Sequence, residues 1–270
     1  MHKDITLKPI GVVKSQFKMP GDMPIPGRGG VVEVFPEYIE ALLGIEENSH
    51  LWILSWFHLS KRNVLKTVPY RIDLGLPEYG VFSVRSPVRP NPVGLSLVQL
   101  NRVEGNVLHV SGLDAVDGTP VIDIKPYFEN DIIFSPRTPK ILPSKREMLI
   151  NLLMRQALNH HQEECPDLLM AVRMTVLAVE KFGRLTLPDL SVIVTGSPCL
   201  ADSIQGLCRA RLSNPPRFEF RPSDSLGQSI WRRGDEVLNI VTLRPINRTG
   251  LTDLTDIEIF DVFQENRASH

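Results

Sequence analysis

Two arginines stand four residues apart in a loop that proline makes stiff. The stretch VRSPVRPNPVGLS, residues 84–96, contains Arg85, Arg89 and Asn91 together with three prolines. Each proline fixes its φ angle near −65° and cannot continue a β ladder. Arginine offers rigid donors that suit carboxylate or phosphate groups, and a stiff loop loses less entropy on binding. The loop is therefore a candidate ligand-binding element, and the alternative is a surface loop with solvated arginines.

A second polar cluster lies in GLDAVDGTPVIDIKPY, residues 112–127. Asp114 and Asp117 flank a turn, because Asp-Gly is a strong turn pair. Asp123 and Lys125 follow on one face of a strand, because strand side chains alternate between the two faces. The simpler interpretation is two turn aspartates and a surface ion pair, which contributes little to stability.

A basic segment follows His58, which itself ends an aromatic run. Residues 60–71, SKRNVLKTVPYR, contain four basic side chains and no acidic one. Such a patch suits phosphate groups, although charge runs are usually solvated surface. A lone histidine in an aromatic run is more often a half-buried core residue than a catalyst.

The cysteines do not have the spacing of a common metal site. Zinc sites usually contain close pairs such as C-x₂₋₄-C, whereas Cys165, Cys199 and Cys208 are far apart and His161 precedes the first of them. We therefore assign no metal ligand from the sequence. An odd, small number of cysteines also argues against a disulfide framework and indicates a reducing compartment.

The overall composition and the missing motifs exclude several classes of protein. Apolar residues make up 42%, charged residues 23%, and the net charge is −1, so the whole molecule has no broad attraction to nucleic acid. The chain has no GxGxxG, GxxxxGK[ST] or GxSxG motif, which disfavours Rossmann dehydrogenases, P-loop ATPases and α/β-hydrolases. Without a signal-peptide core or a membrane-length apolar run, we expect a soluble cytoplasmic protein.

The hydrophobic patterns predict two domains, residues 1–137 and 138–270. The first reads as a mainly β domain, a small barrel or sandwich. Its strands are expected in ITLKPIGVVKS, GGVVEVF, HLWILSWFHLS, YGVFSVRS, TPVIDIKPY and the hairpin SLVQLNRVEGNVLHVSGL, and one short helix in PEYIEALLGIEE.

The second domain reads as α+β and follows a proline-rich linker, SPRTPKILPSK. Ser144 and Glu147 predict a capping box at its first helix. A buried helix in CPDLLMAVRMTVLAVEKFG should end at Gly183. A strand, a tight turn and a helix follow in LSVIVTGSPCLADSIQGLCRARL, then short strands, and the tail after Asp253 forms one last strand or frays.

Several strings together resemble the TrmO/TsaA family over residues 6 to about 137. They are IGVVKS, SHLWILSWFH, VRSPVRPNPVGLS and LDAVDGTPVIDIKPY. The resemblance implies a small β-barrel methyltransferase, unrelated to the doubly wound fold, that binds S-adenosylmethionine. It also implies a tRNA substrate, methylated on N6 of threonylcarbamoyladenosine next to the anticodon, and a homodimer.

The resemblance also implies roles for individual residues. Cofactor binding is expected of Pro24, Ile25, Pro26, His58, Leu59, Arg85, Leu95, Asp114, Ala115, Val116 and Asp117. Substrate binding is expected of Arg89, Asn91, Asp123 and Lys125, and a catalytic role of Asp117, Lys125 and Tyr127. The chain departs from the family where Pro24-Ile25-Pro26 replaces a Pro-Arg-Gln triplet, although Arg28 lies nearby.

The second half resembles a degenerate FmdE-type domain over about residues 146–245. Such domains begin with a His-x-His-x-x-Cys-Pro-Gly pattern, in which Asp167 here replaces the glycine. The resemblance implies an accessory domain that has lost a metal site. Two alternatives to tRNA methylation stay open: methyl transfer to another RNA or a small molecule, and a non-catalytic sensor of S-adenosylmethionine.

Overall fold

The protein consists of two compact units, each with its own hydrophobic core. The computed structural model describes residues 5–24, 27–133, 138 and 141–266. Unit 1 comprises Met1–Tyr70 and Leu74–Ile133, and unit 2 comprises Arg71–Asp73 and Phe134–His270. The roles assigned to residues 1–137 and 138–270 stay predictions.

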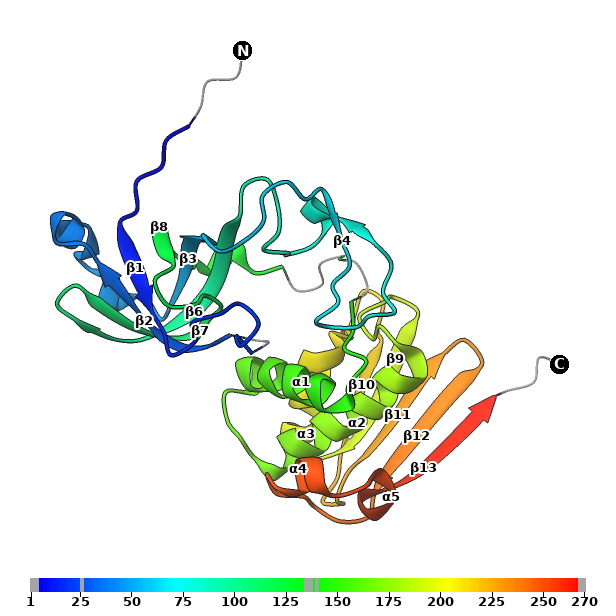
Figure 1. Cartoon of the computed structure of the whole chain (residues 1–270). Coiled ribbons are helices and arrows are strands. Elements are labelled where there is room, and N and C mark those ends of the chain that lie inside the picture. Colours follow the sequence, from blue (N-terminus) through cyan, green and yellow to red (C-terminus); the bar gives the residue numbers. More distant parts are fainter. Residues whose placement is uncertain (1–4, 25–26, 134–137, 139–140, 267–270) are drawn as a thin grey trace. The chain divides into compact units, whose positions relative to one another are not determined.

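Unit 1 is a closed antiparallel barrel of six strands, which confirms the predicted small barrel (Figure 1). The strand order is β1-β2-β7-β6-β3-β8, closing back on β1. The strands are β1 (Gly11–Lys14), β2 (Arg28–Val34), β3 (His50–Trp56), β6 (Val93–Glu104), β7 (Val107–Leu113) and β8 (Pro120–Pro126).

The barrel forms because its strands alternate apolar and polar positions. Along β3, Leu51 and Ile53 point inward and are fully buried, whereas the residues between them are half-exposed. Val13, Val98 and Val121 from other strands complete the same core. Closure leaves no unpaired strand edge, so the loops at the two ends of the barrel are free to carry function.

Two local predictions in unit 1 need correction. The helix expected at residues 36–47 is two short 3₁₀ helices, Pro36–Leu42 and Ile45–Glu47, because Gly44 between them has a left-handed φ of 76°. The strand expected in YGVFSVRS is only the short β5 (Tyr79–Gly80), paired with β4 (Lys66–Thr67), and then a 3₁₀ helix at Val81–Ser83. The barrel is already closed by six other strands and has no edge to offer this segment.

Unit 2 is an α+β fold, as predicted. Its mixed sheet has the order β10-β9-β11-β12-β13, and α1, α2 and α3 lie over one face of it (Figure 1). The strands are β9 (Leu190–Gly196), β10 (Phe218–Pro222), β11 (Gln228–Arg233), β12 (Glu236–Thr242) and β13 (Phe260–Asn266), and the helices α1 (Arg146–His161), α2 (Pro166–Phe182), α3 (Pro198–Cys208), α4 (Gly250–Asp253) and α5 (Asp256–Ile259). A short 3₁₀ helix, Glu129–Asp131, ends the first unit.

One of the two predicted helix ends is confirmed and the other is wrong. Helix α2 ends at Gly183 as predicted, and its N-cap is Cys165, whose sulfur accepts the backbone N–H of Leu168. The capping box expected at α1 is wrong, because the helix begins at Arg146 and the hydroxyl of Ser144 instead donates to a backbone carbonyl in Arg71–Asp73.

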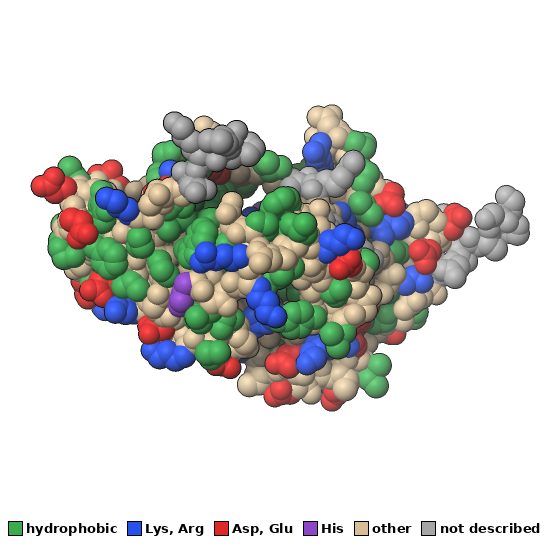
Figure 2. Space-filling view, turned by 45° about the horizontal axis from the view of Figure 1, so that its top comes forward, with side chains coloured by type: hydrophobic (Ala, Val, Ile, Leu, Met, Phe, Trp, Pro, Cys, Tyr) green, Lys and Arg blue, Asp and Glu red, His purple; other side chains and the backbone are tan. Residues whose placement is uncertain are grey.

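The visible surface mixes both signs of charge with apolar side chains (Figure 2). This agrees with the near-zero net charge of the chain. Among the described residues, no helix is both long and apolar enough to cross a membrane.

The proline-rich loop joins the barrel wall through a position that only glycine fits. A Cβ at Gly94 would lie 2.4 Å from a ring carbon of Phe57 and 2.6 Å from the hydroxyl of Ser55. The backbone N–H of Phe57 donates to the carbonyl of Pro92 at 2.8 Å. Gly94 therefore lets Phe57 pack on the barrel core directly beneath the loop.

We expect Gly94→Ala to lower the free energy of unfolding by about 1–3 kcal/mol, because the added methyl group must displace Phe57. Hydrogen exchange followed by mass spectrometry should show faster exchange in β3 and β6 and unchanged exchange in α2. The matched control is Gly80→Ala, where a Cβ meets nothing and φ is −60°; it should change stability by less than about 1 kcal/mol. Equal effects of the two changes would contradict the packing argument.

Candidate functional site

Strand order gathers most of the predicted site residues at one end of the barrel. Because neighbouring strands are antiparallel, the C-terminal ends of β1, β3 and β7 meet the N-terminal ends of β2, β6 and β8. The register documents this, with Lys14 opposite Val31 in β2 and Trp56 opposite Val93 in β6. We call this end the loop end; its segments are residues 14–18, residue 28, residues 57–62, residues 84–92 and residues 113–119.

Arg89 explains why the proline-rich loop is rigid. Its guanidinium donates to the carbonyls of Ser86 at 2.7 Å, Val81 at 2.8 Å and Val84. Three of the five N–H donors of this side chain are thus used within the loop itself. Arg89 therefore positions the loop, and the substrate-binding role expected of it stays a prediction.

Arg85 lies in the same loop but does not hold it together. Its side chain is exposed and makes no hydrogen bond or ion pair with any described residue. Asn91 is exposed as well, and its backbone carbonyl accepts the N–H of Val93. The stiff loop therefore presents one unused guanidinium to solvent, as a ligand-binding arginine requires.

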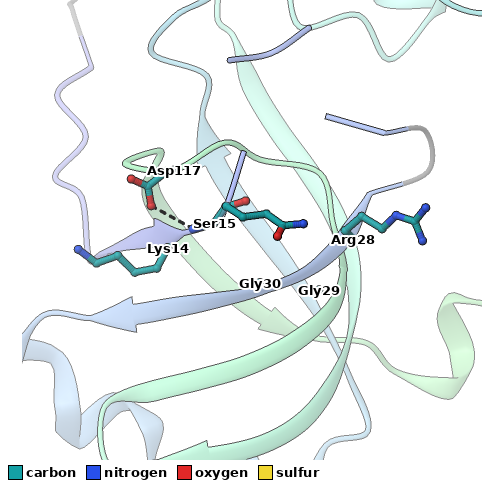
Figure 3. Close-up of a pocket in the computed structure, with 7 residues that line it drawn as sticks. Lys14, Ser15, Arg28, Gly29, Gly30 and Asp117 are labelled. Carbon is teal, nitrogen blue, oxygen red and sulfur yellow. Dashed lines mark hydrogen bonds between the residues drawn. The ribbon is translucent and has the colours of Figure 1, made fainter. Parts of the chain in front are cut away.

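Asp117 ties the turn after β7 to the segment after β1. One carboxylate oxygen accepts the N–H of Ser15 at 3.0 Å, as drawn in Figure 3, and the other pairs with Nζ of Lys18 at 2.7 Å. The hydrogen bond from Lys18, and then that from Ser15, lowers the pKa of Asp117. Gly118 follows with φ at 73°, which completes the predicted Asp-Gly turn.

The rest of the Asp114–Asp117 loop is partly buried. Ala115 and Val116 are buried as whole residues, at 4% and 8% exposure, and the carbonyl of Val116 accepts the N–H of Thr119. Asp114 is exposed, and its N–H donates to the hydroxyl of Ser96 at 3.4 Å. Both aspartates therefore border solvent at the loop end.

An open depression of about 610 Å³ lies at the loop end beside Asp117. In Figure 3, Lys14 and Asp117 lie at one end of it and Arg28 extends at the other. Its lining residues are Lys14, Ser15, Gln16, Arg28, Gly29, Gly30 and Asp117. Of the predicted cofactor-binding triplet, Pro24 is half-buried and Ile25 and Pro26 lie outside the described residues.

His58 and Leu59 are exposed directly after β3, on the β3–β6 side of the loop end. Basic residues continue from them, and the guanidinium of Arg62 lies 5.1 Å from the centre of the Trp56 ring. These residues do not line the depression, so the predicted cofactor contacts occupy two sides of the same barrel end.

The remaining predicted residues lie on the outer wall of the barrel. Leu95 in β6 is opposite Leu54 in β3, which is opposite Asp123 in β8. Lys125 pairs with Asp123 at 2.8 Å, the surface ion pair that the sequence offered as the simpler interpretation.

Tyr127 lies at the far end of the barrel, with its ring 5.9 Å from that of Trp52. The seven residues of β8 separate it from Asp117, a distance of about 20 Å. A single chain therefore does not bring Asp117, Lys125 and Tyr127 together, and the catalytic roles expected of them stay predictions.

The structure adds residues that sequence reasoning missed. Lys18, Ser15 and Gln16 join Asp117 at the loop end. Asp117 and Lys18 are 99 residues apart in the chain, so only the pairing of β1 with β8 reveals their contact. Before the structure, only the closeness of Arg28 to Pro24-Ile25-Pro26 along the chain pointed to this group of residues.

Known proteins resemble this chain over the barrel. The family described as "tRNA-methyltransferase O N-terminal domain" matches residues 12–131. A "Probable S-adenosyl-L-methionine-binding protein" of Methanothermobacter thermautotrophicus is 50% identical over 131 residues, covering 47% of this chain and 93% of the relative. The mouse "tRNA (adenine(37)-N6)-methyltransferase" is 49% identical over 92 residues, covering 34% of this chain and 21% of the mouse protein.

A solved structure entitled "Crystal structure of TrmO" is 26% identical, with a TM-score of 0.44, and covers 90% of this chain and 95% of its own. The family match spans all six barrel strands apart from the first residue of β1, and the Methanothermobacter relative is matched over nearly its whole length. The chain therefore belongs to the TrmO family of S-adenosylmethionine-dependent methyltransferases.

Proposed function

We propose that the protein methylates N6 of threonylcarbamoyladenosine next to the anticodon of tRNA. The observation that carries the proposal is that strand order brings the family's motif loops to one barrel end, where Asp117, Lys14 and Arg28 line an open depression. When bound, S-adenosylmethionine would supply an electrophilic methyl group to that end.

The loop end has the chemical groups that this cofactor requires. Arg85 offers an unpaired guanidinium for the cofactor's carboxylate. Asp114 and Asp117 offer negative charge for its sulfonium. A depression of about 610 Å³ lies within the range of small-molecule sites.

The chemistry of the acceptor decides what the protein must contribute. The N6 lone pair of adenine is delocalised into the ring, so the amine is a weak nucleophile and positioning supplies most of the rate enhancement. A loop held rigid by Arg89 and three prolines suits that task.

The proton released from N6 needs an acceptor. Asp117 is a poor one, because Lys18 and Ser15 occupy its oxygens and lower its pKa. Tyr127 is about 20 Å from Asp117 in the same chain. Water is therefore the acceptor that we favour, with Asp117 holding the turn in place.

Basic side chains at the loop end suit a polyanionic substrate. This local charge is compatible with a net charge of −1 for the whole chain, because phosphate contacts depend on a local patch. The exposed members are Lys14, Lys18, Arg28, Lys61, Arg62 and Arg85.

Methyl transfer to another RNA or a small molecule is the second candidate. It is favoured by the Pro24-Ile25-Pro26 segment, which replaces the Pro-Arg-Gln triplet of the resembling family. A non-catalytic sensor is the third candidate. Homodimerisation and a cytoplasmic location stay predictions.

We expect Arg85→Ala to weaken S-adenosylmethionine binding by about 10- to 100-fold, the size of a lost charge-assisted hydrogen bond. Isothermal titration calorimetry measures the affinity. Arg102→Ala is the matched control, because Arg102 is an exposed arginine of the same barrel that pairs with Glu104 at the opposite end. Arg85→Ala protein that binds as tightly as the wild type would remove Arg85 from the cofactor site.

We expect the purified protein to methylate tRNA that carries threonylcarbamoyladenosine and to leave tRNA lacking this modification unchanged. Nucleoside mass spectrometry after incubation with S-adenosylmethionine measures the product. Methylation of a different nucleoside would favour the second candidate. Cofactor binding without turnover on any tRNA fraction would favour the sensor.

We expect Lys18→Met to raise the pKa of Asp117 toward its usual value without fully restoring it, because the N–H of Ser15 still donates to the carboxylate. Carbon-13 NMR titration of the carboxyl group measures this. Lys14→Met is the control, since Lys14 is the smallest of the causes that lower this pKa.

Because the folded-state pKa of Asp117 is lowered, its contribution to stability is complete above the unfolded-state pKa of about 3.9. That contribution disappears as the pH falls through the lowered folded-state value. The stability difference between wild type and Lys18→Met should therefore be present at neutral pH and vanish in strong acid. A difference that persists in strong acid would show that the ion pair is not its cause.

A further inference from the structure

Three soft ligand side chains converge in unit 2, far from the methyltransferase motifs in the sequence. His161 is the last residue of α1, Cys165 is the N-cap of α2, and Cys199 lies in the first turn of α3. Their ligand atoms all lie within 4.8 Å of one another. Three separate helix ends thus place one nitrogen and two sulfurs around a single point.

The imidazole is oriented for metal binding by a carboxylate. Because a carboxylate oxygen accepts hydrogen bonds, Nδ1–H of His161 donates to Oδ2 of Asp202 at 2.7 Å. This leaves the lone pair of Nε2 directed toward Cys165, with 3.5 Å between Nε2 and the sulfur. A carboxylate that holds the outer nitrogen of a ligating histidine is a recurrent feature of zinc sites.

The orienting carboxylate and one of the thiols come from the same helix. Asp202 is three residues after Cys199 in α3, so the two side chains share a helix face. The side chain of His161 is 11% exposed, which shields the cluster from bulk water. Packing of α1 against α3 therefore fixes both the position of the Cys199 thiol and the orientation of the His161 imidazole.

The separation between Nε2 of His161 and the sulfur of Cys165 matches a shared metal ion. Zinc bonds of about 2.3 Å to sulfur and 2.0 Å to nitrogen in a tetrahedron place these atoms about 3.5 Å apart. The nitrogen–sulfur separation of 3.5 Å agrees with this value. A donor set of two thiolates and one imidazole binds zinc in preference to hard cations such as magnesium.

The third cysteine lies outside the cluster. Cys208 is at the other end of α3 and fully buried, and burial raises the pKa of its thiol to about 12. It is therefore an inert core side chain and a natural control.

We propose that His161, Cys165 and Cys199 bind one Zn²⁺ ion, leaving the fourth position for water or a small ligand. A cavity of about 310 Å³ is lined, among others, by Asp167, Ser197 and Pro198, close sequence neighbours of the two cysteines, although none of the three proposed ligands lines it. Three protein ligands with one open position are typical of zinc sites that act on a ligand. The proposal is independent of the function proposed for unit 1.

The first test measures metal in the full-length protein purified under reducing conditions. We expect one zinc per chain by plasma mass spectrometry. Replacement by Co²⁺ should give the thiolate charge-transfer and visible bands of a tetrahedral cobalt site. The cobalt spectrum needs no variant, so it tests the site even where a substitution disturbs folding.

The second test assigns the ligands by competition between protein and a chromogenic zinc chelator. Cys165→Ser, Cys199→Ser and His161→Ala should each lose at least about 10-fold in zinc affinity, and Asp202→Asn should lose about 10- to 100-fold. Cys208→Ala and His160→Ala are the matched controls and should bind zinc as the wild type does. Circular dichroism confirms the fold of each variant.

Three outcomes would overturn the proposal. One is reduced wild-type protein that takes up neither Zn²⁺ nor Co²⁺ stoichiometrically. Another is a Cys165–Cys199 disulfide that forms in place of metal binding, seen as a mass loss of about 2 Da that reductant reverses. Unchanged zinc affinity in well-folded Cys165→Ser and Cys199→Ser proteins would equally exclude this cluster as the site.

Discussion

The pairing of β1 with β8 is the constraint on which the rest of unit 1 depends. Val12 opposite Pro120 and Gly11 opposite Val121 close the sheet into a barrel. Closure places the segment after β1 against the turn before β8, and so brings Lys18 to Asp117. Without it, six strands would form an open sheet whose loops would not meet around a common point.

Arg85 and Arg89 have different roles in the proline-rich loop. Arg89 donates to carbonyls of the 3₁₀ turn and fixes the loop, whereas Arg85 is exposed and makes no hydrogen bond or ion pair with a described residue. The turn exists because residues 79–84 have no place in the closed barrel. The stiffness of the loop was predictable from its prolines, but this division of roles was not, because it depends on where the turn's carbonyls point.

The sequence predicted those features that depend on local patterns. Alternation located the barrel strands, turn residues located the β6–β7 hairpin, and Gly183 located the end of α2. It failed where tertiary contacts decide: the 3₁₀ segments at residues 36–47 and 81–83, and the capping box at Ser144.

The predicted catalytic residues are not neighbours within one chain. Motif strings show which residues belong together in a family, but not that one strand length separates Asp117 from Tyr127. A strand places its first and last residues at opposite ends of the barrel, whatever motif they share. Residues close in sequence were thus far apart, whereas Lys18 and Asp117, distant in sequence, are in contact.

The cluster in unit 2 follows the same logic with helices in place of strands. Spacing rules look for ligands that are close in the chain, whereas here packing of α1, α2 and α3 assembles them. The hydroxyl of Ser197 donates to Asp167 at 2.6 Å and so ties the N-terminal ends of α2 and α3 together, next to Cys165 and Cys199.

Unit 2 does not need a metal to hold these helices in place. Leu168, Met174 and Ile204 are fully buried in its core and belong to the same helices. A small zinc finger must gain its folding energy from the ion, because it has almost no core. A site preorganised by a large hydrophobic core can instead leave one coordination position open, which is the arrangement expected where the metal acts on a ligand and is not needed for structure.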